Sequence, residues 1–204
     1  MGKNIGLLLL GLTVIFAGST FTMALDAEES SRSDSAFLTG HMTLTVFDEN
    51  GYVKSYSQSD NAIVRNGMTI LAQETFGTST LTGGIGSSNG PVSHMGIGTS
   101  ATATDPTDTS LTTITGCDRL PATITATAAS GDTFATVTIS ATATFAGGPV
   151  DSSCSVAGNI QEAGMFNDVS GGEMFARNVG FGAVSQLGSA DTLKIDWDFT
   201  FTDT

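Results

Sequence analysis

Residues 120–145 read LPATITATAASGDTFATVTISATATF, and this stretch decides the fold class. From Ala135 to Phe145, apolar residues alternate with threonine or serine at every position. A period of two places successive side chains on opposite faces of a strand, and it excludes an amphipathic helix, whose period is about 3.6. The turn residues Ser130-Gly131-Asp132 separate this run from a similar one before it. We therefore predict a long antiparallel hairpin with an apolar inner face and an outer face of hydroxyl groups.

The two faces of this hairpin are defined by its alternating positions. On the first strand the inner residues are Leu120, Ala122, Ile124, Ala126 and Ala128. On the second strand they are Ala135, Val137, Ile139, Ala141, Ala143 and Phe145. The threonines and the serine between them form the outer face. We expect that face to be solvated, and a packing surface between subunits or an adhesive surface remains the alternative.

Shorter runs on both sides extend the strand pattern. Met42–Phe47 and Tyr52–Ser57 flank Asn50-Gly51, a pair that tolerates positive φ and favours a tight hairpin. Only 66–76 has a helical period. Further strands are expected at 95–98, 160–166, 173–181 and 193–201. The sequence therefore predicts an all-β antiparallel β-sandwich with Greek-key or jelly-roll-like connections and one short helix.

The N-terminus has the pattern of an export signal. Residues 1–24 combine Lys3 with the apolar run Ile5–Gly18 and then small residues. The apolar stretch is also just long enough to cross a bilayer. A cleaved signal peptide and an uncleaved membrane anchor, both helical, are therefore open alternatives. Residues 25–37 are expected to form a flexible spacer and 38–204 the β-sandwich domain, which we expect outside the cell or on its surface.

The charge of the chain limits its partners. It carries 20 acidic and 7 basic side chains, for a formal net charge of −13. Such a chain repels phosphate backbones, so we expect no nucleic-acid partner. The acidity favours solubility in salty water, with binding of divalent cations as the alternative. No cofactor is expected, although a calcium loop at Asp105–Asp108 remains an alternative.

Cys117 and Cys154 are the only cysteines. In an exported chain two cysteines favour a disulfide. This disulfide would close a loop of about 37 residues, which contributes on the order of 4 kcal/mol in the chain-entropy model. His41 and His94 have no metal-ligand spacing, so no metal site is expected.

Catalytic motifs are missing from the sequence. There is no zinc-protease motif and no phosphate-binding loop. Glu162 and Glu173 are the one pair that suggests two opposed carboxylates. They fall in neighbouring strands, and we expect them to be acids at an edge or a turn. We therefore predict that the protein is not an enzyme and has no catalytic residues.

The C-terminal half contains a recurrent pattern. Residues 159–166 read NIQEAGMF, 171–177 read GGEMFAR and 191–199 read DTLKIDWDF, with MGIGT upstream at 95–99. Over about half of the chain, 95–201, this pattern resembles β-rich structural proteins of phage and virus tails or virions. The first half is similar to exported archaeal surface proteins. The resemblance implies a structural role.

These observations predict an exported structural subunit of a cell-surface or extracellular filament, self-assembling or adhesive. A virion or tail structural protein and a monomeric carbohydrate- or surface-binding module are the alternatives. The expected partners are other copies or other filament subunits, with membrane contact only through residues 1–24 if these stay uncleaved. The strand over 37–47 either pairs with a neighbouring subunit or completes its own sheet through Asn50-Gly51. The hairpin over 120–145 carries no Lys or Arg to guard an edge.

Overall fold

The computed structural model describes residues 13–14, 21–22, 36–76, 90–113, 117–129, 136–147, 159–182, 184 and 187–203. Contacts divide the chain into two units, Met1–Asp34 and Ser35–Thr204. In the first unit, β1 (Thr13–Val14) pairs antiparallel with β2 (Phe21–Thr22). The backbone is extended at these four positions, and the predicted N-terminal helix remains a prediction. The rest of the predicted signal or anchor and nearly all of the spacer lie outside the described residues. Within the described ranges, no helix combines the length and the apolar character needed to span a membrane.

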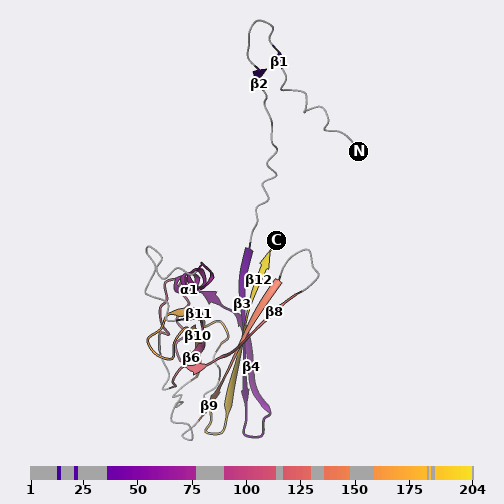
Figure 1. Ribbon diagram of the computed structural model, residues 1–204. Coiled ribbons are helices and arrows are strands. Elements are labelled where there is room, and N and C mark those ends of the chain that lie inside the picture. Colours follow the sequence, from indigo (N-terminus) through magenta and orange to yellow (C-terminus); the bar gives the residue numbers. More distant parts are fainter. Residues whose placement is uncertain are drawn as a thin grey trace. The chain divides into compact units, whose positions relative to one another are not determined.

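The second unit is built from two five-stranded antiparallel sheets. In spatial order the large sheet contains β4 (Val53–Asp60), β3 (Ala36–Phe47), β12 (Thr192–Asp203), β9 (Thr136–Ala146) and β8 (Thr123–Ala128). The small sheet contains β5 (Ala62–Ile63), β11 (Met174–Asn178), β10 (Glu162–Phe166), β6 (His94–Gly98) and β7 (Leu120–Pro121). Helix α1 (Arg65–Phe76) lies beside β11 (Figure 1). This arrangement confirms the predicted all-β sandwich with one short helix.

The main core lies between the two sheets and is centred on β12. Leu193, Ile195, Trp197 and Phe199 alternate along this strand and are at most 3% exposed. The Trp197 ring stacks on Phe199 with centroids 5.8 Å apart, and Phe175 of β11 meets Phe199 edge-on at 5.1 Å. Full burial of each such side chain contributes about 1.5–3 kcal/mol. The period-two pattern of the sequence therefore becomes the contact between the sheets.

Strand β3 completes its own sheet. It pairs with β12 along its whole length, from Ala36 opposite Asp203 to Phe47 opposite Thr192. On its other side it pairs with β4 through the predicted turn, where Gly51 has a φ of 81°. β3 is thus paired on both sides from His41 to Phe47, whereas residues 36–39 pair with β12 alone, and donation of this strand to a neighbouring subunit remains a prediction (Figure 1).

The predicted hairpin is present, with two corrections. β8 and β9 pair without a break from Thr123 opposite Thr142 to Ala128 opposite Val137. The turn residues of the hairpin lie outside the described part of the chain. The first correction is that Leu120–Pro121 belong to the small sheet as β7. The second is that all six residues of β8 are exposed, so their apolar face is not buried.

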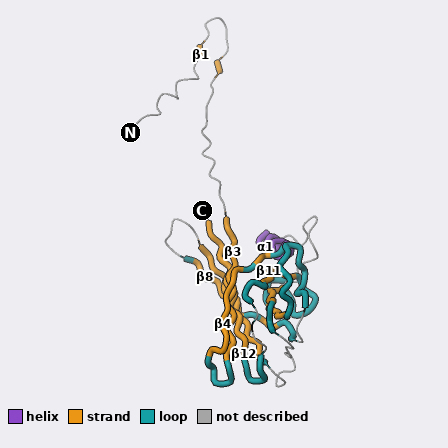
Figure 2. The backbone as a smooth tube through the Cα atoms, turned by 180° about the vertical axis from the view of Figure 1, so that it is seen from behind, coloured by secondary structure: helices purple, strands orange, loops and turns teal. Residues whose placement is uncertain are grey.

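The exposure of β8 has a simple geometric cause. The strands of the small sheet span at most five residues, whereas β3, β9 and β12 span eleven or twelve. The small sheet is therefore too short to cover the whole of the large one, and buried positions on β9 begin only at Ala141. Figure 2 shows β8 on the side of the molecule away from the small sheet and its loops.

Candidate functional site

The small sheet carries a buried ion pair on the face turned away from the core. The register of β10 and β11 places Arg177 opposite Gly164, next to Glu162 on the same face. Both charged side chains are fully buried. The guanidinium Nη2 and Nε atoms donate to Glu162 Oε2 at 2.7 and 3.0 Å. Burial alone would lower the pKa of Arg177, but its hydrogen bonds to Glu162 and Asp108 outweigh burial and raise that pKa. Arg177 therefore carries its positive charge where it meets Glu162.

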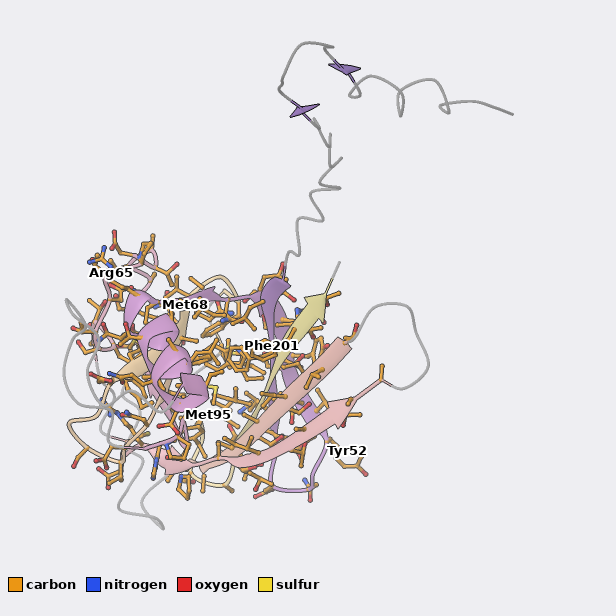
Figure 3. All side chains as sticks on the ribbon, turned by 45° about the horizontal axis from the view of Figure 1, so that its top comes forward. Tyr52, Arg65, Met68, Met95 and Phe201 are labelled. Atoms are coloured by element: carbon orange, nitrogen blue, oxygen red, sulfur yellow. The ribbon has the colours of Figure 1, made fainter. Side chains whose placement is uncertain are left out.

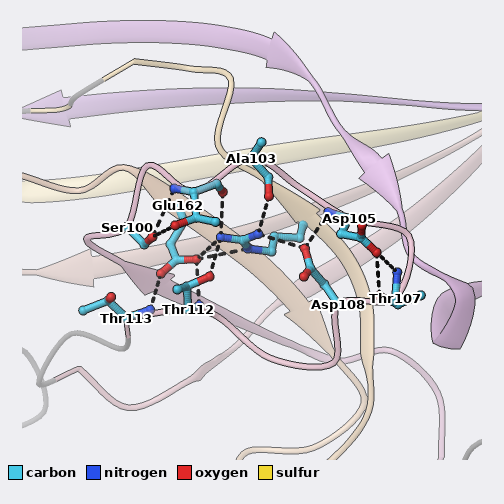
Figure 4. Close-up of polar contacts among 10 residues, drawn as sticks. Ser100, Ala103, Asp105, Thr107, Asp108, Thr112, Thr113 and Glu162 are labelled. Carbon is cyan, nitrogen blue, oxygen red and sulfur yellow. Dashed lines mark hydrogen bonds and ion pairs between the residues drawn. The ribbon is translucent and has the colours of Figure 1, made fainter.

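This ion pair fastens a loop over the outer face of the small sheet. Arg177 Nη1 donates to Asp108 Oδ2 at 2.8 Å, and Nη2 donates to the hydroxyl oxygen of Thr112 at 2.9 Å and to the backbone oxygen of Thr102 at 3.1 Å. Glu162 accepts the backbone N–H groups of Thr112 and Thr113 at 3.0 and 2.7 Å. Figure 4 shows these bonds converging from the loop on one guanidinium and one carboxylate. We call this set of contacts the Arg177 clamp.

A glycine makes room for the Arg177 clamp. Gly98 of β6 lies opposite Glu162 in the register of β6 and β10. A Cβ atom at Gly98 would lie 2.4 Å from Glu162 Oε1 and 2.4 Å from the backbone oxygen of Thr113. Any larger residue would push the carboxylate or the loop away. The glycine is thus required by close approach rather than by an unusual backbone angle.

Apolar side chains complete the cover of this face. Val64, Leu111, Phe166 and Met174 form a second, small hydrophobic cluster. The guanidinium of Arg119 lies over the Phe166 ring, 3.4 Å from its centroid, an arrangement that favours a cation. A cavity here, bordered by Leu111, Arg119 and Phe166, has a volume of about 20 Å³, which is room for about one water molecule. The cavity is too small to hold a substrate.

The structure corrects the prediction for Glu162 and places Glu173 elsewhere. Glu162 is not an edge or turn acid, because it lies on β10 in the middle of its sheet and pairs with Arg177. Glu173 immediately precedes β11 and is partly buried, and this burial raises the pKa of its carboxyl. Arg177 was not predicted from the sequence as a residue of any site. The signal was a pair of opposite charges within two mostly apolar runs, 160–166 and 174–177.

The calcium-loop residues have protein partners. Asp105 accepts the hydroxyl and the backbone N–H of Thr107 at 2.5 and 2.8 Å, and these bonds lower the pKa of Asp105. Asp108 faces the guanidinium of Arg177. Among the residues that the structure describes, no three His, Cys, Asp or Glu side chains are grouped as metal ligands. Calcium binding at this loop remains a prediction.

The other predicted residues lie apart from the clamp or outside the description. His41 contacts Asp60 at 3.1 Å on the large sheet, and the Nδ1 atom of His94 lies 2.9 Å from the Ser93 hydroxyl. Cys117 is buried beside Arg119 in the border of the small cavity. Its predicted partner Cys154 lies outside the described residues, so the disulfide remains a prediction.

The outer face of the large sheet carries hydroxyl and carboxylate groups. Thr142 donates to Asp196 at 2.7 Å and Ser140 donates to Asp198 at 2.5 Å, each from β9 to β12. These threonine and serine side chains are therefore not only solvated, because two of them bind a neighbouring strand. On β8 the same face carries only threonines and no carboxylate.

Strand β8 forms the edge of the large sheet. It is the last strand in the sheet order, and its register with β9 contains no bulge. Proteins normally protect an edge strand with charged residues or a proline. The segment Thr123–Ala128 contains neither. Of the described surface, this edge is the best candidate for contact with another chain. Figure 3 shows the strands of this side of the sheet with their side chains.

Comparison with protein families, with curated proteins and with solved structures finds no match.

Proposed function

We propose that this protein is an exported structural subunit that self-associates at the cell surface or in an extracellular filament. The observation that carries the proposal is the fully exposed, uncharged edge strand β8. An edge strand presents unpaired N–H and C=O groups that another strand can bind. A sheet with such an edge is suited to assembly by strand pairing.

The two edges of the large sheet differ in the way this proposal requires. At the opposite edge, β4 carries Lys54 and Asp60, and the turn before it carries Asp48 and Glu49. Charges of this kind oppose edge-to-edge pairing. On β8 the apolar side is held open by the shortness of the small sheet, and its other side carries only threonines.

The small sheet supports a structural role in another way. In the Arg177 clamp, other protein groups form hydrogen bonds with both the buried guanidinium and the buried Glu162 carboxylate. A satisfied buried network of this kind makes a covering loop rigid. Because the cavity beside it holds only about one water, the clamp supports a scaffold rather than a reaction.

Sedimentation velocity and negative-stain microscopy of the full chain test the proposal. We expect the protein to form oligomers or filaments as its concentration rises. Because each copy carries a formal charge of −13, salt screens the repulsion between copies, and association should increase as salt is added. A protein that stays monomeric at every concentration and salt level would contradict self-association.

A second candidate function is binding to a carbohydrate or other surface as a monomer. The observation that favours it is the exposure of both tyrosines on the β3–β4 hairpin, 72% for Tyr52 and 59% for Tyr56. Exposed aromatic rings with a polar hydroxyl suit contact with amphipathic ligands. Retention of the protein on insoluble polysaccharide, and its loss in the Tyr52→Ala/Tyr56→Ala variant, would favour this function if the protein is also monomeric.

A further inference from the structure

We propose that two copies of this chain join through β8, each pairing antiparallel with the other across a two-fold axis at Ala126. The inference rests on the proposed self-association and specifies the surface and register that carry it. Its basis is the direction of the backbone groups of β8, the order of its side chains and its lack of charge.

The direction of the backbone groups is fixed at both ends of β8. At one end, the N–H of Ala129 donates to the oxygen of Thr136 at 2.9 Å, so residue 129 faces β9. At the other end, the N–H of Ala122 points the opposite way and donates to the oxygen of Ser93 at 2.8 Å. In an antiparallel ladder this direction alternates with each residue.

The alternation identifies the groups at the open edge. Residues 123, 125 and 127 face β9 like residue 129. The N–H and C=O groups of Ile124, Ala126 and Ala128 point away from β9. Since β8 is the last strand of its sheet in the described part of the chain, no strand there pairs with these groups.

The register follows from using all of these groups. If Ala126 lies opposite Ala126 of the second copy, then Ile124 lies opposite Ala128 and Ala128 opposite Ile124. Every outward N–H and C=O group of both strands then has a partner. A shift by two residues keeps the faces matched but pairs Ile124 with Ala126 and leaves Ala128 without a partner. The pairing centred on Ala126 therefore forms the most hydrogen bonds.

The side chains of β8 fit the same arrangement. A two-fold axis perpendicular to the sheet keeps each face on its own side, so the Ile124, Ala126 and Ala128 face continues into the same residues of the second copy. On the opposite face Thr125 lies beside Thr127 of the second copy, a favourable cross-strand pair. No carboxylate lies on either strand, which avoids the repulsion expected between two chains of charge −13.

A two-fold contact of this kind joins two copies and then closes. The joined sheets form one sheet in which β8 is central in place of being an edge. Growth of a filament from such pairs therefore requires a second surface, because the β8 edge is used up within each pair.

Cysteine cross-linking of the full chain tests the register. In the proposed pair, the two copies of Ala126→Cys have Cα atoms about 5.5 Å apart, within the range for a disulfide. Ile124→Cys is the matched control, because its two copies are offset by four residues, roughly 13 Å. Thr125→Cys tests the neighbouring register. Wild-type protein oxidised in parallel accounts for any dimer formed through Cys117 or Cys154.

We expect Ala126→Cys to form a covalent dimer at least about 100-fold faster than either control, since the paired strands hold the thiols at an effective concentration near the millimolar range. Ala126→Pro should abolish the non-covalent association, and it should fold because the N–H of residue 126 has no partner within its own sheet. Ala126→Lys provides the same test if the proline variant does not fold.

Equal cross-linking of all three cysteine variants, faster cross-linking of Thr125→Cys, or unchanged association of a folded Ala126→Pro or Ala126→Lys variant would overturn the inference. If the wild type assembles in the microscope and these results are found, the β8 pair is wrong and the proposed function stands. If the wild type does not assemble at all, both fail.

Discussion

The outer face of the small sheet and the β8 side of the large sheet solve the problem of a sheet surface in opposite ways. On the small sheet, a buried guanidinium and a buried carboxylate bind a long loop that covers the face. On the large sheet, β8 has no charged residue and no cover in the described part of the chain. Charged side chains thus hold the cover of the small sheet in place, and they are missing from the exposed edge strand β8.

The comparison teaches that exposure alone does not show a defect of packing. The chain forms a covering loop over the small sheet, but no described loop covers β8. Leaving β8 open exposes backbone groups that an edge strand normally protects. Such a surface is stable in isolation because water satisfies its groups, and it remains available to another strand.

The largest expected effect comes from breaking the closed face. Arg177→Met removes the cation that neutralises Glu162 and Asp108 and leaves the buried Glu162 carboxylate without a countercharge, with only the Thr112 and Thr113 N–H groups as donors. We expect a loss of about 3–5 kcal/mol in the free energy of unfolding, measured by chemical denaturation. Arg65→Met, a change at an exposed arginine, is the matched control and should cost less than about 0.5 kcal/mol. Equal effects of the two changes would contradict a clamping role for Arg177.

The next effect concerns the space under the loop. Gly98→Ala places a methyl group 2.4 Å from the Glu162 carboxylate and from the Thr113 backbone oxygen. We expect a loss of about 1–3 kcal/mol from overpacking. In Gly180→Ala the new Cβ would meet its nearest neighbours at 3.6 Å, so this control should be nearly neutral. A thermal melt of both variants decides the matter, and a neutral Gly98→Ala would show that the loop yields easily.

A third prediction concerns Asp191, which lies directly before β12 of the large sheet. At the end where β12 begins, Asp191 accepts Lys54 Nζ at 2.6 Å and the Gly188 N–H at 2.7 Å, and these bonds lower the pKa of Asp191. Its contribution to stability is present above the unfolded pKa of about 3.9 and is lost as pH falls through the lower folded value.

Asp191→Asn should therefore cost about 1 kcal/mol at pH 7, a modest value because Lys54 is partly exposed. The difference from wild type should shrink as the pH falls below about 4. Urea denaturation at several pH values measures this dependence. A difference that is independent of pH would show that the charge of Asp191 does not carry the effect.

The smallest effect is expected at Glu173, where burial raises the pKa of the carboxyl. A raised pKa in the folded state means that ionisation costs stability once the pH rises through that pKa. Glu173→Gln should therefore be more stable than wild type at pH 7, by less than about 1 kcal/mol. The advantage should fade as the pH falls toward about 4.3, the unfolded value.

The exposed Glu49→Gln change is the control for this last variant and should show no such trend. A Glu173→Gln variant that is less stable than wild type at neutral pH would contradict this prediction, because it would mean that the ionised carboxylate stabilises the folded protein.

Much of the fold was predictable because its signals are local. The alternation in β9 and β12 and the Asn50-Gly51 turn each specify a strand or a hairpin without knowledge of the rest of the chain. The assignment of alternate residues of β8 and β9 to two opposite faces also followed from the sequence. The exposure of β8 did not, because it depends on the length of the small sheet opposite, and alternation shows which residues share a face but not whether anything covers it.

The Arg177 clamp was not predicted for a related reason. Along the sequence, Glu162 and Arg177 are far from the loop that they bind, and Thr102 lies 75 residues before Arg177. A charged residue in an apolar run shows that a partner is needed, but the sequence does not say which loop supplies it. The pairing of Phe37–Phe47 with β12, and of its later part with β4, was likewise not specified by the sequence, because both partners lie elsewhere in the fold.

Hydrogen exchange at the amides of β8 tests the central contrast most directly. In dilute protein, the N–H groups of Ile124, Ala126 and Ala128 should exchange rapidly, whereas those of β10 and β11 should be protected. On assembly at high concentration, the three β8 amides should become protected and those of β10 and β11 should not change. Protection of the β8 amides already in the dilute monomer, or their continued rapid exchange in the assembled protein, would contradict the account.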